Sequence, residues 1–179
     1  MIAPFAAMLL AAPAPAVPPC SVAHLAGCTD TNRLVWAKDF RPALARFLGR
    51  YGRDRIAYLY PGRLLPQIED VLGGPPDAPQ RLPDGGILFT ACRPHSCTEK
   101  GAIAFDADGQ IVVVSIVSYR CGTGGRCASS PELDHYVRDP AGSAVARAAI
   151  HAWAQAQTDD DNRVLHGGPL GSPIVHVLR

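Results

Sequence analysis

The chain has 179 residues, which is enough for one ordinary domain or at most two very small ones. Lys and Arg total 17 against 16 Asp and Glu, so the formal net charge is +1. This overall balance gives no reason to expect nucleic acid or an anionic membrane as the main partner. The hydrophobic fraction of 47% is typical of a globular domain and excludes a disordered chain.

The first 16 residues have the pattern of an export signal. An apolar run, Met1 to Leu10, leads to Ala14-Pro15-Ala16, which has the small-x-small form of a signal-peptidase site. The run is too short to span a membrane, and no later segment is long enough. We therefore expect cleavage after about Ala16 and a periplasmic or secreted bacterial protein, with a retained apolar tail as the alternative.

A second targeting pattern follows at Leu25-Ala26-Gly27-Cys28, which has the form of a lipoprotein box. Lipid attachment at Cys28 is the minority interpretation, because it would leave an odd number of cysteines and because His24 interrupts the apolar run. The preferred division is a disulfide-tied, irregular lead-in at residues 17–35 and a single domain at residues 36–179.

Six cysteines after an export signal predict an oxidising compartment and a disulfide framework. They allow 15 connectivities. The simplest joins neighbours in sequence, namely Cys20–Cys28, Cys92–Cys97 and Cys121–Cys127.

The predicted elements, in chain order, begin with a helix that Asp39 caps and Gly49 ends. A strand at 56–60 and a short helix at 66–72 follow, and residues 73–86, rich in Pro and Gly, form a loop. Three strands are expected at 87–91, 102–106 and 111–119, the last two joined by an Asp-Gly turn. A helix at 143–157 and a strand at 174–178 complete the chain. Strands flanked by helices predict an α+β fold with an antiparallel sheet.

The sequence contains no common catalytic motif, and we expect no enzyme activity, cofactor or metal. Gly122 to Gly125 is interpreted as a disulfide-tied turn, and Asp159 to Asn162 as a solvated acidic turn after the helix. Five scattered histidines are interpreted as ordinary surface or core residues: His24, His135, His151, His166 and His176.

The hexapeptide Cys92-Arg93-Pro94-His95-Ser96-Cys97 directly follows a predicted strand. A disulfide would close it into a tight loop, with Pro94 restricting the backbone just before His95. A metal site at Cys92, His95 and Cys97 is disfavoured because oxidised cysteines cannot bind metal, and the spacing is not that of a thioredoxin. A stapled turn with an incidental histidine remains open.

The hexapeptide resembles the Cys-Lys-Pro-His-Asp-Cys loop of the Ivy family, periplasmic inhibitors of vertebrate lysozyme. The likeness extends over about residues 40–119, with Arg93 in place of Lys and Ser96 in place of Asp. It implies an antiparallel sheet with helices packed on one side, sometimes as a dimer, so a homodimer is among the expectations. It also implies that residues 92–97 enter the cleft of a C-type lysozyme, where His95 contacts the catalytic carboxylates.

The function predicted from the sequence is therefore inhibition of a C-type lysozyme or a related muramidase. The alternative is a periplasmic binding protein on the same scaffold that regulates an endogenous lytic transglycosylase or binds another cell-wall component. Neither alternative involves nucleic acid or a membrane span.

Overall fold

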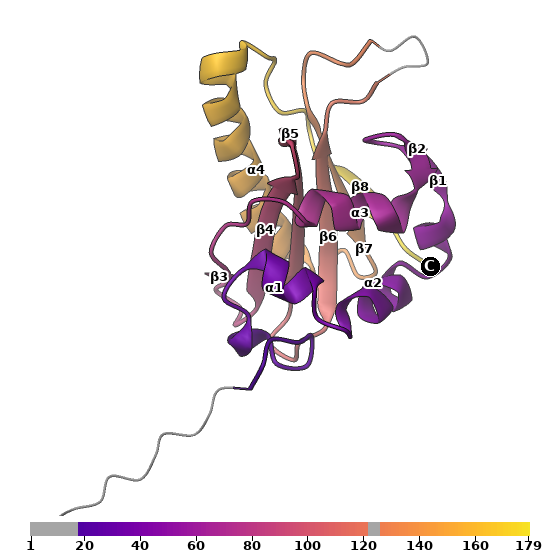
Figure 1. Cartoon of the computed structure of the whole chain (residues 1–179), viewed down its shortest axis with the longest axis vertical. Coiled ribbons are helices and arrows are strands. Elements are labelled where there is room, and N and C mark those ends of the chain that lie inside the picture. Colours follow the sequence, from indigo (N-terminus) through magenta and orange to yellow (C-terminus); the bar gives the residue numbers. More distant parts are fainter. Residues whose placement is uncertain (1–17, 122–125) are drawn as a thin grey trace, which may run out of the picture.

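The computed structural model describes residues 18–121 and 126–179, and it has an α+β fold (Figure 1). The predicted export signal and the Gly122–Gly125 turn lie outside the described residues. The helices are α1 (Thr31–Val35), α2 (Phe40–Leu48), α3 (Leu64–Leu72) and α4 (Ala144–Leu165), with 3-10 turns η1 (Leu25–Gly27) and η2 (Gly49–Arg53). The strands are β1 (Arg55–Ala57), β2 (Pro61–Arg63), β3 (Gln80–Arg81), β4 (Ile87–Arg93), β5 (Ser96–Phe105), β6 (Ile111–Ser118), β7 (Glu132–Val137) and β8 (Ile174–Val177).

Six strands form the main sheet, in the order β3-β4-β5-β6-β7-β8, and β1 and β2 form a small hairpin beside it. The first four pairings of the main sheet are antiparallel. The expectation of an antiparallel sheet is wrong at one edge, because β8 runs parallel to β7. The chain returns from β7 through α4 before it enters β8, and such a crossover reverses the direction of the chain twice.

Helices cover both faces of this sheet, so the expectation that they pack on one side is wrong. Side chains alternate between the faces of a strand. In β6, Val114 and Ile116 lie in a core cluster with residues of α1, α2 and α3, while Val113 and Val117 lie in a second cluster with α4. The apolar stripe of α4, which includes Ile150, needs a sheet face of its own to be buried.

The lead-in is more ordered than expected. Asp30 caps α1 by accepting a hydrogen bond from the backbone N–H of Arg33, at 2.9 Å. Cys28 is buried and forms a disulfide with Cys20. The lead-in is therefore tied by a disulfide, as the preferred interpretation expects.

All three sequence-local disulfides are present. They indicate an oxidising, extracytoplasmic setting. Over the described ranges, no helix combines the length and the apolar character needed to cross a membrane.

Several elements differ in extent from the prediction. The strand β5 begins at Ser96, six residues before its expected start, and β7 was not predicted. The helix α4 continues to Leu165, so Asp159 to Asn162 belong to a helix and not to a turn after it.

Candidate functional site: the disulfide-closed hairpin

The hexapeptide is the tip of the β4–β5 hairpin, with Arg93 paired to Ser96 and Pro94-His95 forming the turn. The next pair along the ladder joins Cys92 to Lys100, so β5 holds a bulge of three residues there. The bulge places Cys97 beside Cys92, and their Cα atoms are 4.7 Å apart. The disulfide therefore closes the tip of the hairpin directly behind the turn, and residues 93–96 protrude beyond it.

His95 occupies the second position of the turn with φ of 65°. Pro at the first position and a positive φ at the second is the pattern favoured in a type II turn. Histidine is among the side chains that tolerate this region better than most, although glycine is preferred. Pro94 and His95 are both exposed, and no described residue forms a hydrogen bond with the His95 ring. The imidazole is thus free to hydrogen-bond to a partner through both nitrogens.

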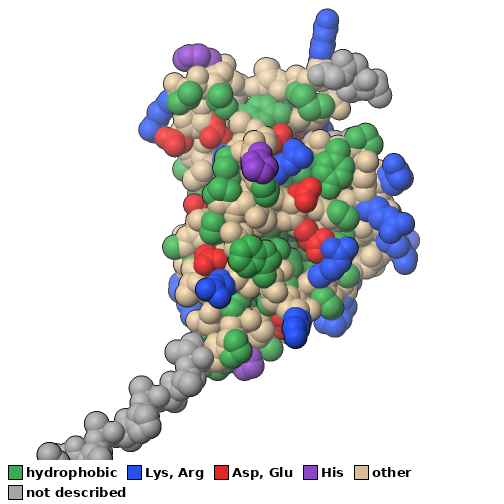
Figure 2. Space-filling view, viewed as in Figure 1, with side chains coloured by type: hydrophobic (Ala, Val, Ile, Leu, Met, Phe, Trp, Pro, Cys, Tyr) green, Lys and Arg blue, Asp and Glu red, His purple; other side chains and the backbone are tan. Residues whose placement is uncertain are grey.

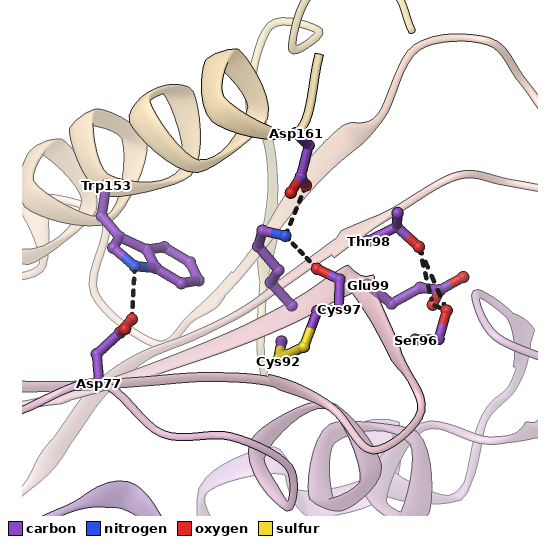
Figure 3. Close-up of a disulfide and its surroundings, with 9 residues drawn as sticks. Asp77, Cys92, Ser96, Cys97, Thr98, Glu99, Trp153 and Asp161 are labelled. Carbon is purple, nitrogen blue, oxygen red and sulfur yellow. Dashed lines mark hydrogen bonds and ion pairs between the residues drawn. A yellow bond between two sulfur atoms is a disulfide. The ribbon is translucent and has the colours of Figure 1, made fainter. Parts of the chain in front are cut away.

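The carboxylate of Glu99 fixes the residues that flank the turn. It accepts hydrogen bonds from the hydroxyls of Ser96 and, at 3.4 Å, Thr98 (Figure 3). The Arg93 guanidinium lies 4.0 Å from the same carboxylate. Both sides of the His95 turn are therefore held by one acidic side chain inside the bulge.

A buried lysine ties the hairpin to α4. The Lys100 side chain is 3% exposed, and its ammonium donates to the Cys97 carbonyl and, at 2.7 Å, to the Asp161 carboxylate. Burial is the main cause of the raised pKa of the Tyr119 phenol, directly after β6, and the carboxylates of Asp161 and Glu99 add to it. The hairpin base, β6 and the end of α4 thus form one connected unit.

The segment after α3 supports the other side of the hairpin. The Cys92 N–H donates to the Pro75 carbonyl at 3.1 Å. A Cβ on Gly74 would collide with the Cys92 carbonyl oxygen, so only glycine allows this close approach. Further along, Asp77 accepts a hydrogen bond from Thr90. It also accepts one from Trp153 of α4 (Figure 3).

Aromatic contacts extend the support on the α3 side. The Arg93 guanidinium lies over the Tyr60 ring, 6.0 Å from its centroid, and the Tyr60 hydroxyl donates to Asp70 at 2.8 Å. Burial is the main cause of the raised pKa of Tyr60, with Asp70 adding to it. Arg93 is therefore oriented by an aromatic face as well as by Glu99.

The structure brings together all six predicted hairpin residues, but not the remaining candidates. The acidic run separates: Asp159 bonds to Gln155, Asp160 to Arg163 and Asp161 to Lys100. Within the described part of the chain, no group of three or more His, Cys, Asp or Glu residues could hold a metal ion.

Two of the scattered histidines have buried hydrogen-bond partners. His176 pairs with the buried Asp134 at 2.7 Å and stacks on Tyr136. His135 is buried and bonded to Ser115 at 2.7 Å.

Glu99, Lys100 and Asp161 were missed by sequence reasoning. The available signal was the polar run Ser96 to Lys100 directly before an apolar strand. Such a run permits an extended hairpin, but it does not show that a lysine within it is buried.

The site is a protrusion and not a cleft. A pocket of about 1190 Å³ lies between the lead-in, α2 and the β5–β6 turn, and none of residues 92–97 lines it. An exposed imidazole on a turn that a disulfide and Glu99 hold in place is suited to entering a cavity of another molecule.

No protein-family model matches the chain, and neither a curated protein nor a solved structure matches it significantly.

Proposed function

We propose that this protein inhibits a C-type lysozyme or a related muramidase by inserting the 92–97 hairpin into the active-site cleft, on an Ivy-like scaffold. The observation that carries the proposal is the exposed His95 at the tip of a turn closed by the Cys92–Cys97 disulfide. The likeness of this hexapeptide to the Ivy loop supports the choice of target.

The chemistry of such an enzyme suits an imidazole. Retaining glycosidases hold two carboxyl groups about 5–5.5 Å apart, and lysozyme is the standard example. His95 offers one ring nitrogen to each carboxyl, and as an imidazolium it donates to both. Because the disulfide, Pro94 and Glu99 order the turn before binding, little further ordering is needed on association.

The Ser96 departure from the Ivy loop is compensated locally. Where the family has Asp, this chain has a hydroxyl, and that hydroxyl donates to the Glu99 carboxylate. An anion therefore lies beside the turn although the residue at position 96 is neutral. We infer that Glu99 supplies the negative charge that the family places one residue after the histidine.

The test is an inhibition assay with hen-type lysozyme, comparing the unmutated protein with His95→Ala and His95→Asn. Asn tolerates a positive φ and so separates loss of the imidazole from backbone strain. Both variants should lose at least 100-fold in inhibition with unchanged thermal stability, whereas His151→Asn, an exposed histidine on α4, should inhibit normally. Full inhibition by His95→Asn would contradict the proposed contact between the His95 imidazole and the catalytic carboxylates. Binding to a lytic transglycosylase without binding to lysozyme would favour the alternative function.

The disulfide provides a second prediction. The variant Cys92→Ser/Cys97→Ser should fold, because the sheet and both cores remain, but it should bind about tenfold more weakly since the turn must be ordered on binding. The matched control is Cys121→Ser/Cys127→Ser. Equal inhibition by the 92/97 variant and the unmutated protein would contradict the role of pre-ordering.

A further inference from the structure

Arginines gather on one part of a chain that is almost neutral overall. Residues 41–63 contain six arginines and a single acidic residue, Asp54. All six side chains are exposed, and they belong to α2, η2, β1 and β2: Arg41, Arg46, Arg50, Arg53, Arg55 and Arg63. Figure 2 shows basic side chains along the edge of the molecule where Figure 1 places these elements. We call these six residues the arginine face.

Most of this charge has no partner in the protein. Among the described residues, the only ion pair of the arginine face joins Arg41 to Glu69. The Arg50 guanidinium stacks near its neighbour Tyr51, 5.3 Å from the ring centroid. The remaining guanidiniums keep their charge available for a ligand.

Two of the arginines are placed against each other. In the β1–β2 hairpin, Arg55 is directly opposite Arg63. Like charges at opposed positions destabilise a strand pair. A two-stranded hairpin has little stability to lose, so this pairing is better explained by a ligand that neutralises it than by the needs of the fold.

A pocket of about 300 Å³ opens within the arginine face. Its lining includes Arg41 from α2, Arg53 from η2 and Arg63 from the end of β2, together with Gly49 and Gly52. Three guanidiniums line this small pocket, two of them without an ion-pair partner in the described part of the chain and Arg41 paired with Glu69, and this set matches a compact anion. Arginine, and not lysine, supplies every cation, and its planar fork binds phosphate oxygens in pairs.

We propose that the arginine face binds phosphate groups, with one phosphate seated in the pocket between Arg41, Arg53 and Arg63. The extent of the face, beyond the pocket, fits a surface that carries many phosphates, and we assign it to the headgroups of an anionic lipid bilayer. Among the described residues of the 41–63 region, no large apolar side chain is exposed, so contact is with headgroups and not with the bilayer interior. This assignment is independent of the hairpin and its target.

The test is sedimentation with vesicles of phosphatidylglycerol and phosphatidylcholine, against phosphatidylcholine alone, with inorganic pyrophosphate as a soluble competitor. We expect binding only to the anionic vesicles, falling steeply with added salt. Arg53→Gln/Arg63→Gln should weaken binding at least tenfold. Arg46→Gln/Arg50→Gln removes the same charge outside the pocket and should weaken it about threefold.

Stability gives an independent readout. Because Arg63→Gln removes the repulsion from Arg55, it should raise the melting temperature while lowering vesicle binding. If both double variants lose vesicle binding equally, the pocket is not a specific phosphate site. Binding to pyrophosphate without binding to vesicles would contradict the assignment to lipid headgroups, and absence of binding to both would contradict the whole proposal.

Discussion

Glu99 is the residue on which the orientation of the turn depends, and it can be tested without altering His95. Glu99→Gln keeps the length of the side chain and removes its charge, so Ser96 and Arg93 lose a charged partner. Hydrogen bonds to a charged group are worth about 1.5–3 kcal/mol, and we expect inhibition of lysozyme to weaken 10-fold or more.

A variant that carries the negative charge at position 96 in place of position 99 is the control for that experiment. Ser96→Asp in the Glu99→Gln background returns an anion to the flank of the turn and should recover most of the inhibition. Asp108→Asn, which removes an exposed carboxylate in the β5–β6 turn at the opposite end of the sheet, should have no effect on inhibition. Unchanged inhibition by Glu99→Gln would contradict the role of the anion.

The Lys100–Asp161 pair makes an asymmetric prediction about stability. Asp161→Asn leaves a buried ammonium whose remaining acceptor is the Cys97 carbonyl, and we expect a loss of about 3 kcal/mol in the free energy of unfolding. Lys100→Met leaves a carboxylate that is 25% exposed and can be hydrated, so its cost should be smaller. Urea denaturation measures both, with the exposed Asp160→Asn as the neutral control. The reverse order would contradict the structure.

At the scale of elements, periodic apolar patterns were sufficient for the helices and the central strands. The helix α2 has its predicted extent after Asp39, and β6 begins at its predicted residue. The strand β7 was missed because Asp134 and His135 lie in its middle, and both are buried. Their burial depends on Arg120, His176 and Ser115, which no local pattern brings together.

The covering of the sheet on both faces has a signal in the sequence. The run Ile111 to Val117 is apolar at six of seven positions, which is typical of a strand buried on both faces. The predicted end of α4 was wrong for a different reason. Acidic residues suggested a turn, yet Asp161 continues the helix because Lys100 neutralises it.

The sheet topology predicts that the target contacts more than the hairpin. The β4–β5 turn and the β6–β7 connection leave the sheet at the same end, and Lys100 holds the end of α4 there (Figure 1). A stable inhibitor interface covers about 800 Å² per partner, which six residues cannot provide. Val164 and Leu165, at the end of α4, are 77% and 54% exposed, and Leu165 lies two helical turns beyond the buried Thr158.

We therefore expect Val164→Gln/Leu165→Gln to weaken binding of lysozyme about tenfold without loss of stability. Val145→Gln, at the opposite end of α4 and 40% exposed, should bind normally. Titration calorimetry distinguishes the two variants. Equal affinities would confine the interface to the hairpin and its immediate neighbours.

At the scale of the whole molecule, the second core contains a pH-sensitive group. His135 faces α4, and burial, assisted by the charges of Arg147 and His151, lowers the pKa of its imidazole to about 4. The unfolded chain, with an ordinary histidine pKa near 6.5, binds the proton more readily. Stability should therefore fall as the pH drops from about 6.5 to about 4, by about 3 kcal/mol at most.

Melting temperatures measured between pH 7.5 and pH 4.5 test this expectation. His135→Gln should flatten the profile over that window, although it lowers the absolute stability, whereas His95→Asn, at an exposed histidine that does not act on His135, should leave the slope in place. An unchanged slope in His135→Gln would assign the pH dependence to other groups.

The net charge of +1 conceals how the charges are distributed. The cluster of arginines at residues 41–63 is visible in the sequence, but only the fold shows that the side chains share a surface and that three of them line a pocket. Total charge predicts whether a protein as a whole is attracted to a polyanion, and it does not report a local field.

The disulfides have a consequence for how the chain matures. Each one joins a cysteine to the next in sequence, with separations of 8, 5 and 6 residues. If an oxidising catalyst acts on thiols in the order in which they leave an export channel, every first pairing is already the native pairing. Biogenesis then requires an oxidase but no disulfide isomerase, and yields of folded protein should be equal in cells with and without that isomerase.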